Sequence, residues 1–242
     1  MAVRELRARV LGQGLTAIAV AAGLAWSGVR VSCARPDHAA MASDPGLQEL
    51  MWSLHRSGAL SFDELPDPDA VFVCGAEEVV APPGSSVINC ALPPWESTRD
   101  LQEALGRPVV SNPQLLREGS ALEDFLSADV AVLGADDAEA LVRADVVLAG
   151  VPVLPLHCDV DSADLVLRAT NGLLRVEREY FDELAELCRA VGADVDGVIE
   201  CVRTDPRIGA GSGQRCAPPR CGPGPRAGEA QPPPVLAELE TS

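Results

Sequence analysis

The chain has 242 residues, of which 47% are hydrophobic and 23% charged, enough apolar sequence to bury the core of one or two domains. Its 36 acidic and 19 basic residues give a net charge of −17, which argues against nucleic acid or an anionic membrane surface as a partner. Every basic residue is an arginine, so no mechanism that needs a lysine ammonium can run on this chain alone.

The N-terminal segment has the pattern of a strand, a helix and a second strand. Residues 8–12 form a short apolar run, residues 15–27 an alanine-rich helical stretch, and residues 29–34 another strand-like run. This order predicts a βαβ unit.

The turn between the first strand and the helix carries a dinucleotide-binding pattern. Gly12, Gly14 and Ala17 occupy the three small positions of GxGxxG/A. The first permits a tight turn, the second lets the backbone approach a pyrophosphate, and the third allows the helix to pack closely on the strand. The pattern favours a cofactor site; the alternative is a purely structural turn.

Arg35 stands where such a site usually has an acid, at the end of the second strand, with Asp37 two residues further on. An acid would accept hydrogen bonds from the ribose 2′-hydroxyl of NAD, whereas an arginine favours a 2′-phosphate or hinders NAD. We therefore expect weak NAD binding, with NADP as an open alternative. Arg35 could equally be a solvated loop residue.

The same segment has features of a targeting leader. Arginines at positions 4, 7 and 9 precede the apolar stretch, and Cys33 follows it. However, glycines interrupt the apolar run, Arg30 stands where a lipoprotein cleavage box needs an aliphatic residue, and residues 15–26 are too few to cross a bilayer. We expect a cytoplasmic protein.

Eight cysteines are present, and none forms a CxxC pair, so a zinc ribbon or a thioredoxin motif is not supported and no metal site is expected. Cys74 and Cys90 lie in apolar, strand-like runs. We expect buried free thiols in a reducing compartment rather than disulfides.

Further elements follow in an alternating order that predicts a parallel sheet with helices on both faces, a Rossmann-like domain over residues 1–155. The expected strands are 70–74, 86–91, 108–111, 129–133 and one or two within 145–156, and the expected helices are 45–57, 98–106 and 136–143.

Beyond this domain the pattern becomes helical. A long helix is expected over 161–191 and a second over 194–203, within a helical dimerisation segment at 156–208. The long helix has apolar residues around more of its circumference than one small domain covers, which indicates a partner surface. Residues 209–242 are rich in Gly, Pro and Arg, which predicts a disordered tail.

Several segments, in one order along the chain, carry the motifs of a known family. The most specific is SNPQLLREGSALEDF at 111–125. Shorter matches are DPGL at 44–47, DAVFVC at 69–74, VINCALPP at 87–94, GADVD at 192–196 and DPRIG at 205–209. Together they resemble the UDP-glucose 6-dehydrogenases from about residue 8 to Gly209.

The resemblance implies an oxidoreductase that uses NAD to oxidise the C6 alcohol of UDP-glucose twice, giving UDP-glucuronate, in a dimer formed through the long helix. In that family a cysteine thiolate captures the intermediate aldehyde, a lysine and an asparagine stabilise the oxyanion, and a glutamate assists water. These roles are covalent catalysis, oxyanion stabilisation and general base catalysis.

At these catalytic positions the sequence departs from the family. Gln114 replaces the glutamate, and a carboxamide cannot act as a general base. Leu167 replaces the lysine, whereas Asn171 keeps the asparagine. The family's GFGGSC loop has no counterpart after Gly209, and Cys221 is a nearby candidate for the nucleophile.

The resemblance places Leu116, Glu118 and Arg207 at substrate-binding positions. For Glu118 a surface capping acid is an equal alternative. The connection between Cys74 and Val87 is shorter than in the family, and the family's C-terminal nucleotide-binding domain has no counterpart here.

Two functions are therefore considered. The first is a catalytically impaired dehydrogenase acting on a UDP-sugar. The second is a non-catalytic paralogue or truncated product that binds a nucleotide or pairs with a second copy or an intact homologue. The replacements at Gln114 and Leu167 favour the second.

Overall fold

A computed structural model of the chain describes residues 5–36, 44–91 and 97–205. The chain divides into two compact units, Met1–Glu177 and Arg178–Ser242. The candidate residues Arg207 and Cys221, and the tail expected to be disordered, lie outside the described residues.

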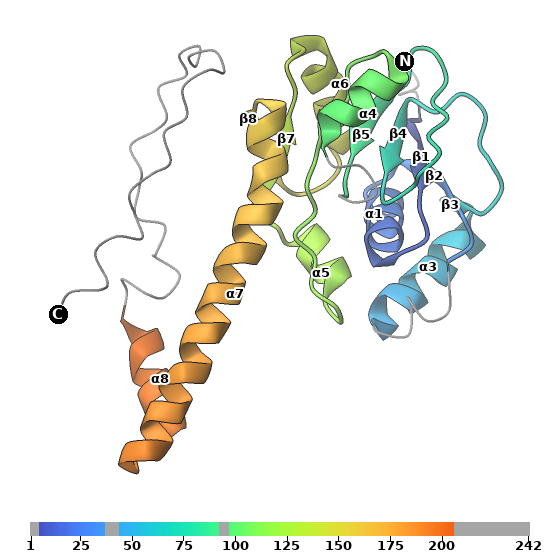
Figure 1. The fold of residues 1–242 in the computed structure, drawn as a ribbon. Coiled ribbons are helices and arrows are strands. Elements are labelled where there is room, and N and C mark those ends of the chain that lie inside the picture. The colour runs from blue at the N-terminus through green and yellow to red at the C-terminus, as the bar shows by residue number, and fades with distance from the viewer. Residues whose placement is uncertain (1–4, 37–43, 92–96, 206–242) are drawn as a thin grey trace, which may run out of the picture. The chain divides into compact units, whose positions relative to one another are not determined.

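The first unit is built on an eight-stranded sheet in the order β3-β2-β1-β4-β5-β6-β7-β8 (Figure 1). The neighbouring strands pair in parallel, except β6 and β7, which are antiparallel. The strands are β1 (Arg7–Leu11), β2 (Arg30–Cys33), β3 (Leu60–Ser61), β4 (Ala70–Val73), β5 (Ser86–Asn89), β6 (Val110–Ser111), β7 (Val130–Gly134) and β8 (Leu154–Cys158). A Rossmann-like sheet followed by a long helix is thereby confirmed.

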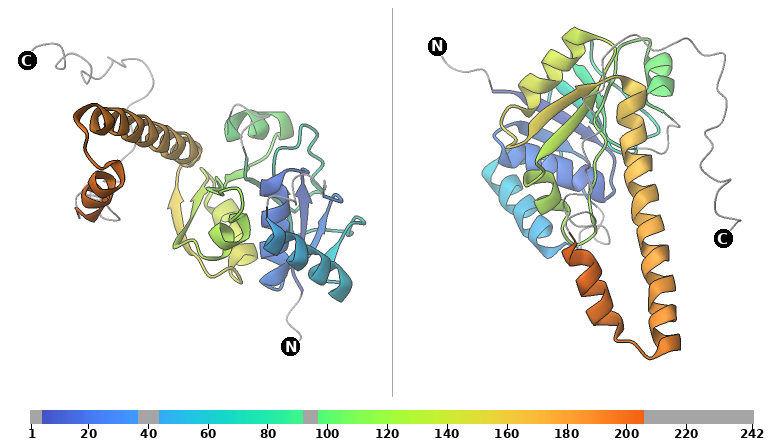
Figure 2. Two further views of the ribbon diagram at one scale, coloured as in Figure 1. Left: turned by 90° about the horizontal axis from the view of Figure 1, so that it is seen from below. Right: turned by 90° about the vertical axis from the view of Figure 1, so that its left-hand side faces the viewer.

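Helices cover the two faces of the sheet (Figure 2). One face packs into the main core with α1 (Leu15–Trp26), α3 (Pro45–Ser57), α5 (Ala121–Leu126) and α6 (Ala138–Leu148). On the other face, α4 (Thr98–Leu105) covers β4 and β5 through a second cluster that contains Val73, Val87 and Leu101. The long helix α7 (Val160–Val191) begins beside β7.

The helix α1 is central because it is almost entirely buried: residues 17–25 are all inside the core. Its Gly23 lies against the ring of Phe125 on α5, where a Cβ atom would collide with the ring. The glycine therefore sets how closely α5 approaches α1, and with it the position of the loop that precedes α5.

The long loop after β3 is held over the sheet by arginines of β1. Arg7 donates from its backbone nitrogen to Asp69 Oδ2 at 3.0 Å, and the Arg9 guanidinium donates to the carbonyl oxygen of Leu65 at 3.3 Å. Arg9 also pairs with Glu64 at 3.4 Å. These polar bonds tie the loop to β1.

The predicted strand or strands over 145–156 are partly wrong. The helix α6 continues to Leu148 and buries Ala144, Val147 and Leu148, so only Leu154–Cys158 is a strand. A short apolar run fits a buried helix as well as a strand, and periodicity alone does not separate the two. The short elements α5 and β3 were also not anticipated.

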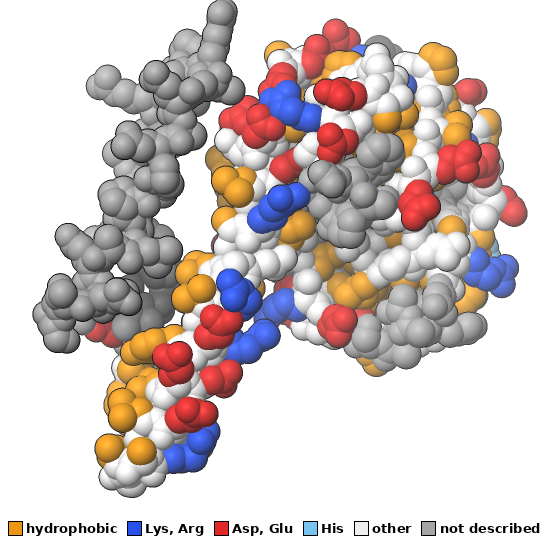
Figure 3. Space-filling view, in the orientation of Figure 1, with side chains coloured by type: hydrophobic (Ala, Val, Ile, Leu, Met, Phe, Trp, Pro, Cys, Tyr) orange, Lys and Arg blue, Asp and Glu red, His pale blue; other side chains and the backbone are white. Residues whose placement is uncertain are grey.

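Exposed hydrophobic side chains line α7 (Figure 3). Within the first unit these are Leu165, Leu173, Leu174 and Val176. In the second unit Tyr180, Leu187 and Val191 are also exposed, while Arg203 of α8 (Val195–Thr204) lies 5.1 Å above the ring of Phe181. In the described residues no helix is both long and apolar enough to cross a membrane.

Candidate functional site

The turn from β1 to α1 has the geometry expected of a dinucleotide-binding turn. Gly12 has φ +129°, and a Cβ atom there would collide with the carbonyl oxygen of Cys74 and approach Ala17. Gly14 is the N-cap of α1 and has open space where a Cβ would stand. An extended backbone with small residues leaves the N-terminal N–H groups of α1 accessible to a phosphate.

A pocket of about 190 Å³ lies at the carboxyl ends of β1 and β2, beside this turn. It is lined by Gly12, Ser32 and Phe62, and by the carboxylates of Asp63 and Glu64. Arg35 is exposed, with its guanidinium carbon 5.3 Å above the Phe62 ring. Two acids therefore line this pocket, and Arg35 is the residue at the position where the glycine pattern leads us to expect a ribose-binding acid.

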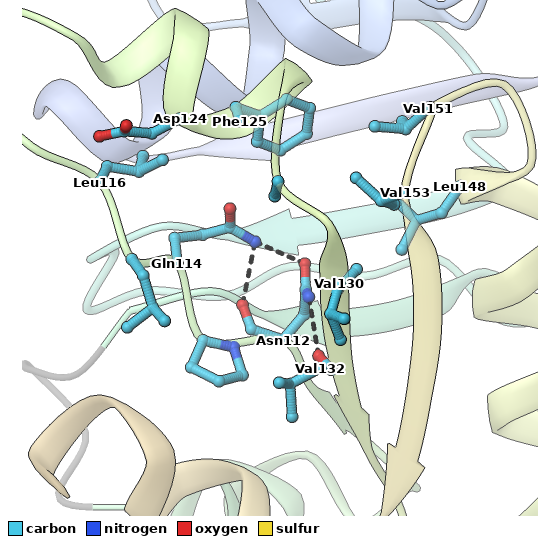
Figure 4. Close-up of a pocket in the computed structure, with 14 residues that line it drawn as sticks. Asn112, Gln114, Leu116, Asp124, Phe125, Val130, Val132, Leu148, Val151 and Val153 are labelled. Carbon is cyan, nitrogen blue, oxygen red and sulfur yellow. Dashed lines mark hydrogen bonds between the residues drawn. The ribbon is translucent and has the colours of Figure 1, made fainter. Parts of the chain in front are cut away.

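A second pocket, of about 100 Å³, lies behind the loop that follows β6 (Figure 4). Gln114 is one of its lining residues, and its Nε2 donates to the backbone oxygen of Asn112 at 3.1 Å and to Asn112 Oδ1 at 2.6 Å. The Asn112 amide in turn donates to the carbonyl oxygen of Val132 on β7 at 2.9 Å. The amide of Gln114 therefore works as a donor that ties the loop to the sheet, a role that an ionised glutamate cannot fill.

The two other loop candidates have different surroundings. Leu116 is half-buried and lines the pocket, whereas Glu118 is exposed and is not among the lining residues. The loop is closed by Arg117, which donates to Asp124 Oδ1 at 2.6 Å. This bond holds the pKa of the Asp124 carboxyl below its usual value.

A third site lies where α4, β6 and α7 meet. Asp164 of α7 accepts hydrogen bonds from Thr98 N at 2.6 Å, Thr98 Oγ1 at 2.8 Å and Ser111 Oγ at 2.6 Å. Leu167, one turn further along α7, lines the remaining cavity with Asn89. That cavity has about 10 Å³, the lower limit for a single water molecule.

Asn171 is exposed on α7, one turn beyond Leu167, and does not line this cavity. The structure thus places Leu167 near Asn89 and leaves Asn171 facing solvent. Gln114 lies in the neighbouring pocket, and Pro113 lines both.

Sequence reasoning missed Asp164, Thr98 and Ser111 as a bonded group. A serine or threonine that opens a helix was the available signal for Thr98, but the partner on α7 is remote in sequence, and only the tertiary structure identifies it. Among the described residues, no group of three or more His, Cys, Asp or Glu side chains could hold a metal ion.

Comparison with known proteins gives sequence matches over part of the chain. Residues 161–227 match the model of the UDP-glucose/GDP-mannose dehydrogenase family, central domain. The UDP-glucose 6-dehydrogenase of Rickettsia typhi is 38% identical over 106 residues, 42% of this chain and 24% of the relative. The UDP-glucose 6-dehydrogenase YwqF of Bacillus subtilis is 31% identical over 112 residues, 46% of this chain and 26% of the relative.

Solved structures extend the match over most of the described fold. A UDP-glucose dehydrogenase from Pyrobaculum islandicum has a TM-score of 0.71 and 28% identity, covering 86% of this chain and 59% of that one. A GDP-mannose dehydrogenase from Pseudomonas aeruginosa shares the fold, with a TM-score of 0.67 and 18% identity. The match covers 84% of this chain and 57% of that one. The matches span about a quarter of the length of the curated relatives. The chain is thus similar to the UDP-glucose/GDP-mannose dehydrogenase family, in sequence over residues 161–227 and in fold over most of its length.

Proposed function

We propose that this chain is a nucleotide-sugar dehydrogenase homologue that binds a nicotinamide dinucleotide and a UDP-sugar but does not itself oxidise UDP-glucose to UDP-glucuronate. The observation that carries the proposal is the bonding of Gln114, whose amide hydrogens are both directed at Asn112 oxygens. The residue at the general-base position serves the structure of the loop and has no basic group to offer.

The surroundings of Leu167 support the same conclusion. An aliphatic side chain offers neither a positive charge nor a hydrogen bond to a developing oxyanion. The cavity beside it has about 10 Å³, too little for a sugar carbon and its oxygen, and the nearby polar groups of Thr98 and Ser111 already bond to Asp164. Oxidation of the sugar would need this space and at least one free donor.

The glycine turn suits the pyrophosphate of a dinucleotide better than the residues after β2 and β3 suit its ribose. Gly12, Gly14 and the N-terminus of α1 would hold the pyrophosphate through backbone N–H groups. At the ribose end Arg35 favours a 2′-phosphate, whereas Asp63 and Glu64 oppose one. We therefore expect weak binding with little preference between NAD and NADP; when bound, the nicotinamide can accept a hydride.

A second role, pairing with a second copy or an intact homologue, is supported by the exposed side chains of α7. Leu173 and Leu174 are 67% and 52% exposed in the single chain, and Leu187 is 60% exposed. Burying such a stripe is favourable.

Light scattering at micromolar concentration should give a dimer that Leu173→Glu weakens about 10- to 100-fold, while the control Glu183→Gln leaves it intact. A monomer unaffected by Leu173→Glu would refute pairing.

A cytoplasmic location is part of the proposal, because the six described cysteines are free thiols, as is usual in a reducing compartment.

The absence of catalysis is tested by incubating the purified chain with UDP-glucose and NAD and measuring NADH, with a full-length UDP-glucose 6-dehydrogenase as positive control. No NADH above background is expected. NADH formation that depends on UDP-glucose would contradict the proposal.

A further inference from the structure

Two cysteines that the proposed function does not use lie opposite each other on neighbouring strands. Cys74 directly follows β4, and Cys90 directly follows β5. The last paired residues of these parallel strands are Val73 and Asn89, and Cys90 N donates to the carbonyl oxygen of Val73 at 2.8 Å. The ladder therefore continues by one residue and sets Cys74 beside Cys90.

Both thiols point to the same face of the sheet. Cys74 and Cys90 belong to the main core with Phe72 and Ile88, whereas Val73 packs in the cluster on the opposite face. Residues at one register position of parallel strands share a face, since side chains alternate along each strand. The two side chains thus lie together in the core, and after burial the nearness of Cys90 is a further cause that raises the pKa of the Cys74 thiol.

The backbone spacing suits a covalent bond between them. Neighbouring strands lie about 4.8 Å apart, and the Cα atoms of bonded cysteines lie about 4.4–6.8 Å apart. The bond would need side-chain rotation and little movement of the strands. The other four described cysteines lie elsewhere. Cys33 on β2 and Cys158 on β8 are each separated from β4 by at least one strand, and Cys188 and Cys201 lie on α7 and α8.

Burial slows the oxidation of this pair of thiols. Cys74 is 4% exposed and Cys90 1% exposed, and burial raises the pKa of the Cys74 thiol well above its usual value. The thiolate is the reactive form, so reaction is slow and needs a small reagent. Cys90 also lines the small cavity beside Leu167, together with the half-buried Ala91.

We propose that Cys74 and Cys90 are an oxidation site that takes a peroxide and forms an intramolecular disulfide. The thiolate of one cysteine attacks hydrogen peroxide, breaking the O–O bond and giving a sulfenic acid and one water. The sulfur of the second cysteine attacks the sulfenic sulfur, forming the S–S bond and releasing the second water. The two thiols lose two electrons and two protons, and the peroxide is reduced to two waters.

The disulfide would link the carboxyl ends of β4 and β5. This link would lie beside the glycine turn, because Gly12 packs directly on the carbonyl oxygen of Cys74. It closes a loop of about 15 residues, so oxidation should raise the Tm of the chain by roughly 5–10 °C. Forming the disulfide removes the contact at 3.8 Å between Cys90 Sγ and Asn112 Oδ1. The loop at Gln114 should stay in place, because Asn112 Oδ1 still accepts the 2.6 Å hydrogen bond from Gln114.

The test treats the full chain with hydrogen peroxide, blocks free thiols after unfolding, and digests with a protease that cleaves after glutamate. Glu77 and Glu78 separate the two cysteines, so a disulfide joins two peptides that come apart on reduction. Trypsin leaves both cysteines in the single peptide 57–99, whose mass falls by two hydrogens when the bond forms.

The expected result is a linked Cys74–Cys90 peptide and a higher Tm that reductant reverses. Cys90→Ser should abolish both effects, whereas the control Cys188→Ser should keep both. Recovery of Cys74 and Cys90 as free thiols or as sulfinic acids, a link to another cysteine, or a Tm rise that persists in Cys90→Ser would overturn the proposal.

Discussion

The glycine turn and the cavity beside Leu167 lie at the same carboxyl edge of the sheet but are built in different ways. The turn depends on backbone: a positive φ at Gly12, open space at Gly14, and the first N–H groups of α1. The cavity depends on side chains, and here Asp164 and its partners bond to one another. A backbone site persists as long as the fold persists, whereas a side-chain site can be lost residue by residue while its polar groups find new partners.

Gly12→Ala would break the backbone site most severely. The added Cβ would meet the carbonyl oxygen of Cys74, at a φ that side chains rarely adopt. We expect the free energy of unfolding to fall by roughly 3–5 kcal/mol, measured by urea denaturation. The control Gly14→Ala, where the Cβ has open space, should change it by less than about 0.5 kcal/mol. Equal stabilities of the two variants would refute the account of the turn.

Asp164→Ala tests whether the side-chain site now serves stability. The substitution removes three hydrogen bonds that join α4, β6 and α7. We expect a loss of roughly 2–4 kcal/mol in the free energy of unfolding. Asp161→Ala is the matched control on the same helix: its carboxylate is 67% exposed and pairs with Arg99 at the surface, so the loss should stay below about 1 kcal/mol. A smaller loss for Asp164→Ala than for Asp161→Ala would contradict a structural role.

Gln114→Glu asks whether the family's residue still fits. A carboxylate would face two oxygen atoms of Asn112 and lose both hydrogen bonds. We expect roughly 1–3 kcal/mol lower stability at neutral pH.

The repulsion should raise the pKa of the new carboxyl group above its unfolded value. The loss should therefore shrink as the pH falls toward about 4, where the protonated form can donate again. Gln114→Met removes the bonds without adding charge, and its loss should not depend on pH in this way. If the Gln114→Glu variant were as stable as the native chain at neutral pH, the Gln114 amide would not stabilise the loop by donating to Asn112.

Arg35→Asp tests whether Arg35 sets the preference between NAD and NADP. The exchange supplies the missing acceptor for the ribose 2′-hydroxyl and repels a 2′-phosphate, so NAD should gain about tenfold over NADP, or ~1.4 kcal/mol. Calorimetric titration of both dinucleotides measures the ratio. An unchanged ratio would mean that Arg35, held over Phe62, lies outside the binding site.

Much of the fold could be predicted from the sequence because its signals are local. The turn at Gly12, the alanine-rich α1 and the apolar strands each carry their pattern within a few residues. The end of α6 could not be placed, since the run from Asp145 to Leu156 suits helix and strand alike.

The candidate site was predictable in part. The motif around Gln114 marked the loop, and the resemblance marked Leu167 as an apolar residue where a lysine was expected. What the sequence could not show was where the polar groups near Leu167 bond, because Asp164 meets Thr98 and Ser111 across more than 50 positions of the chain. The pairing of Cys74 with Cys90 likewise required the register of β4 and β5.

The central claim is that the backbone-built nucleotide site remains while the side chains for oxidation have been replaced. The most direct test is calorimetric titration of NAD into the full chain in the presence of UDP-glucose. The account predicts a weak, saturable binding heat that returns to baseline after every injection. Sustained heat flow after an injection, as turnover produces, or no binding heat at any NAD concentration would contradict it.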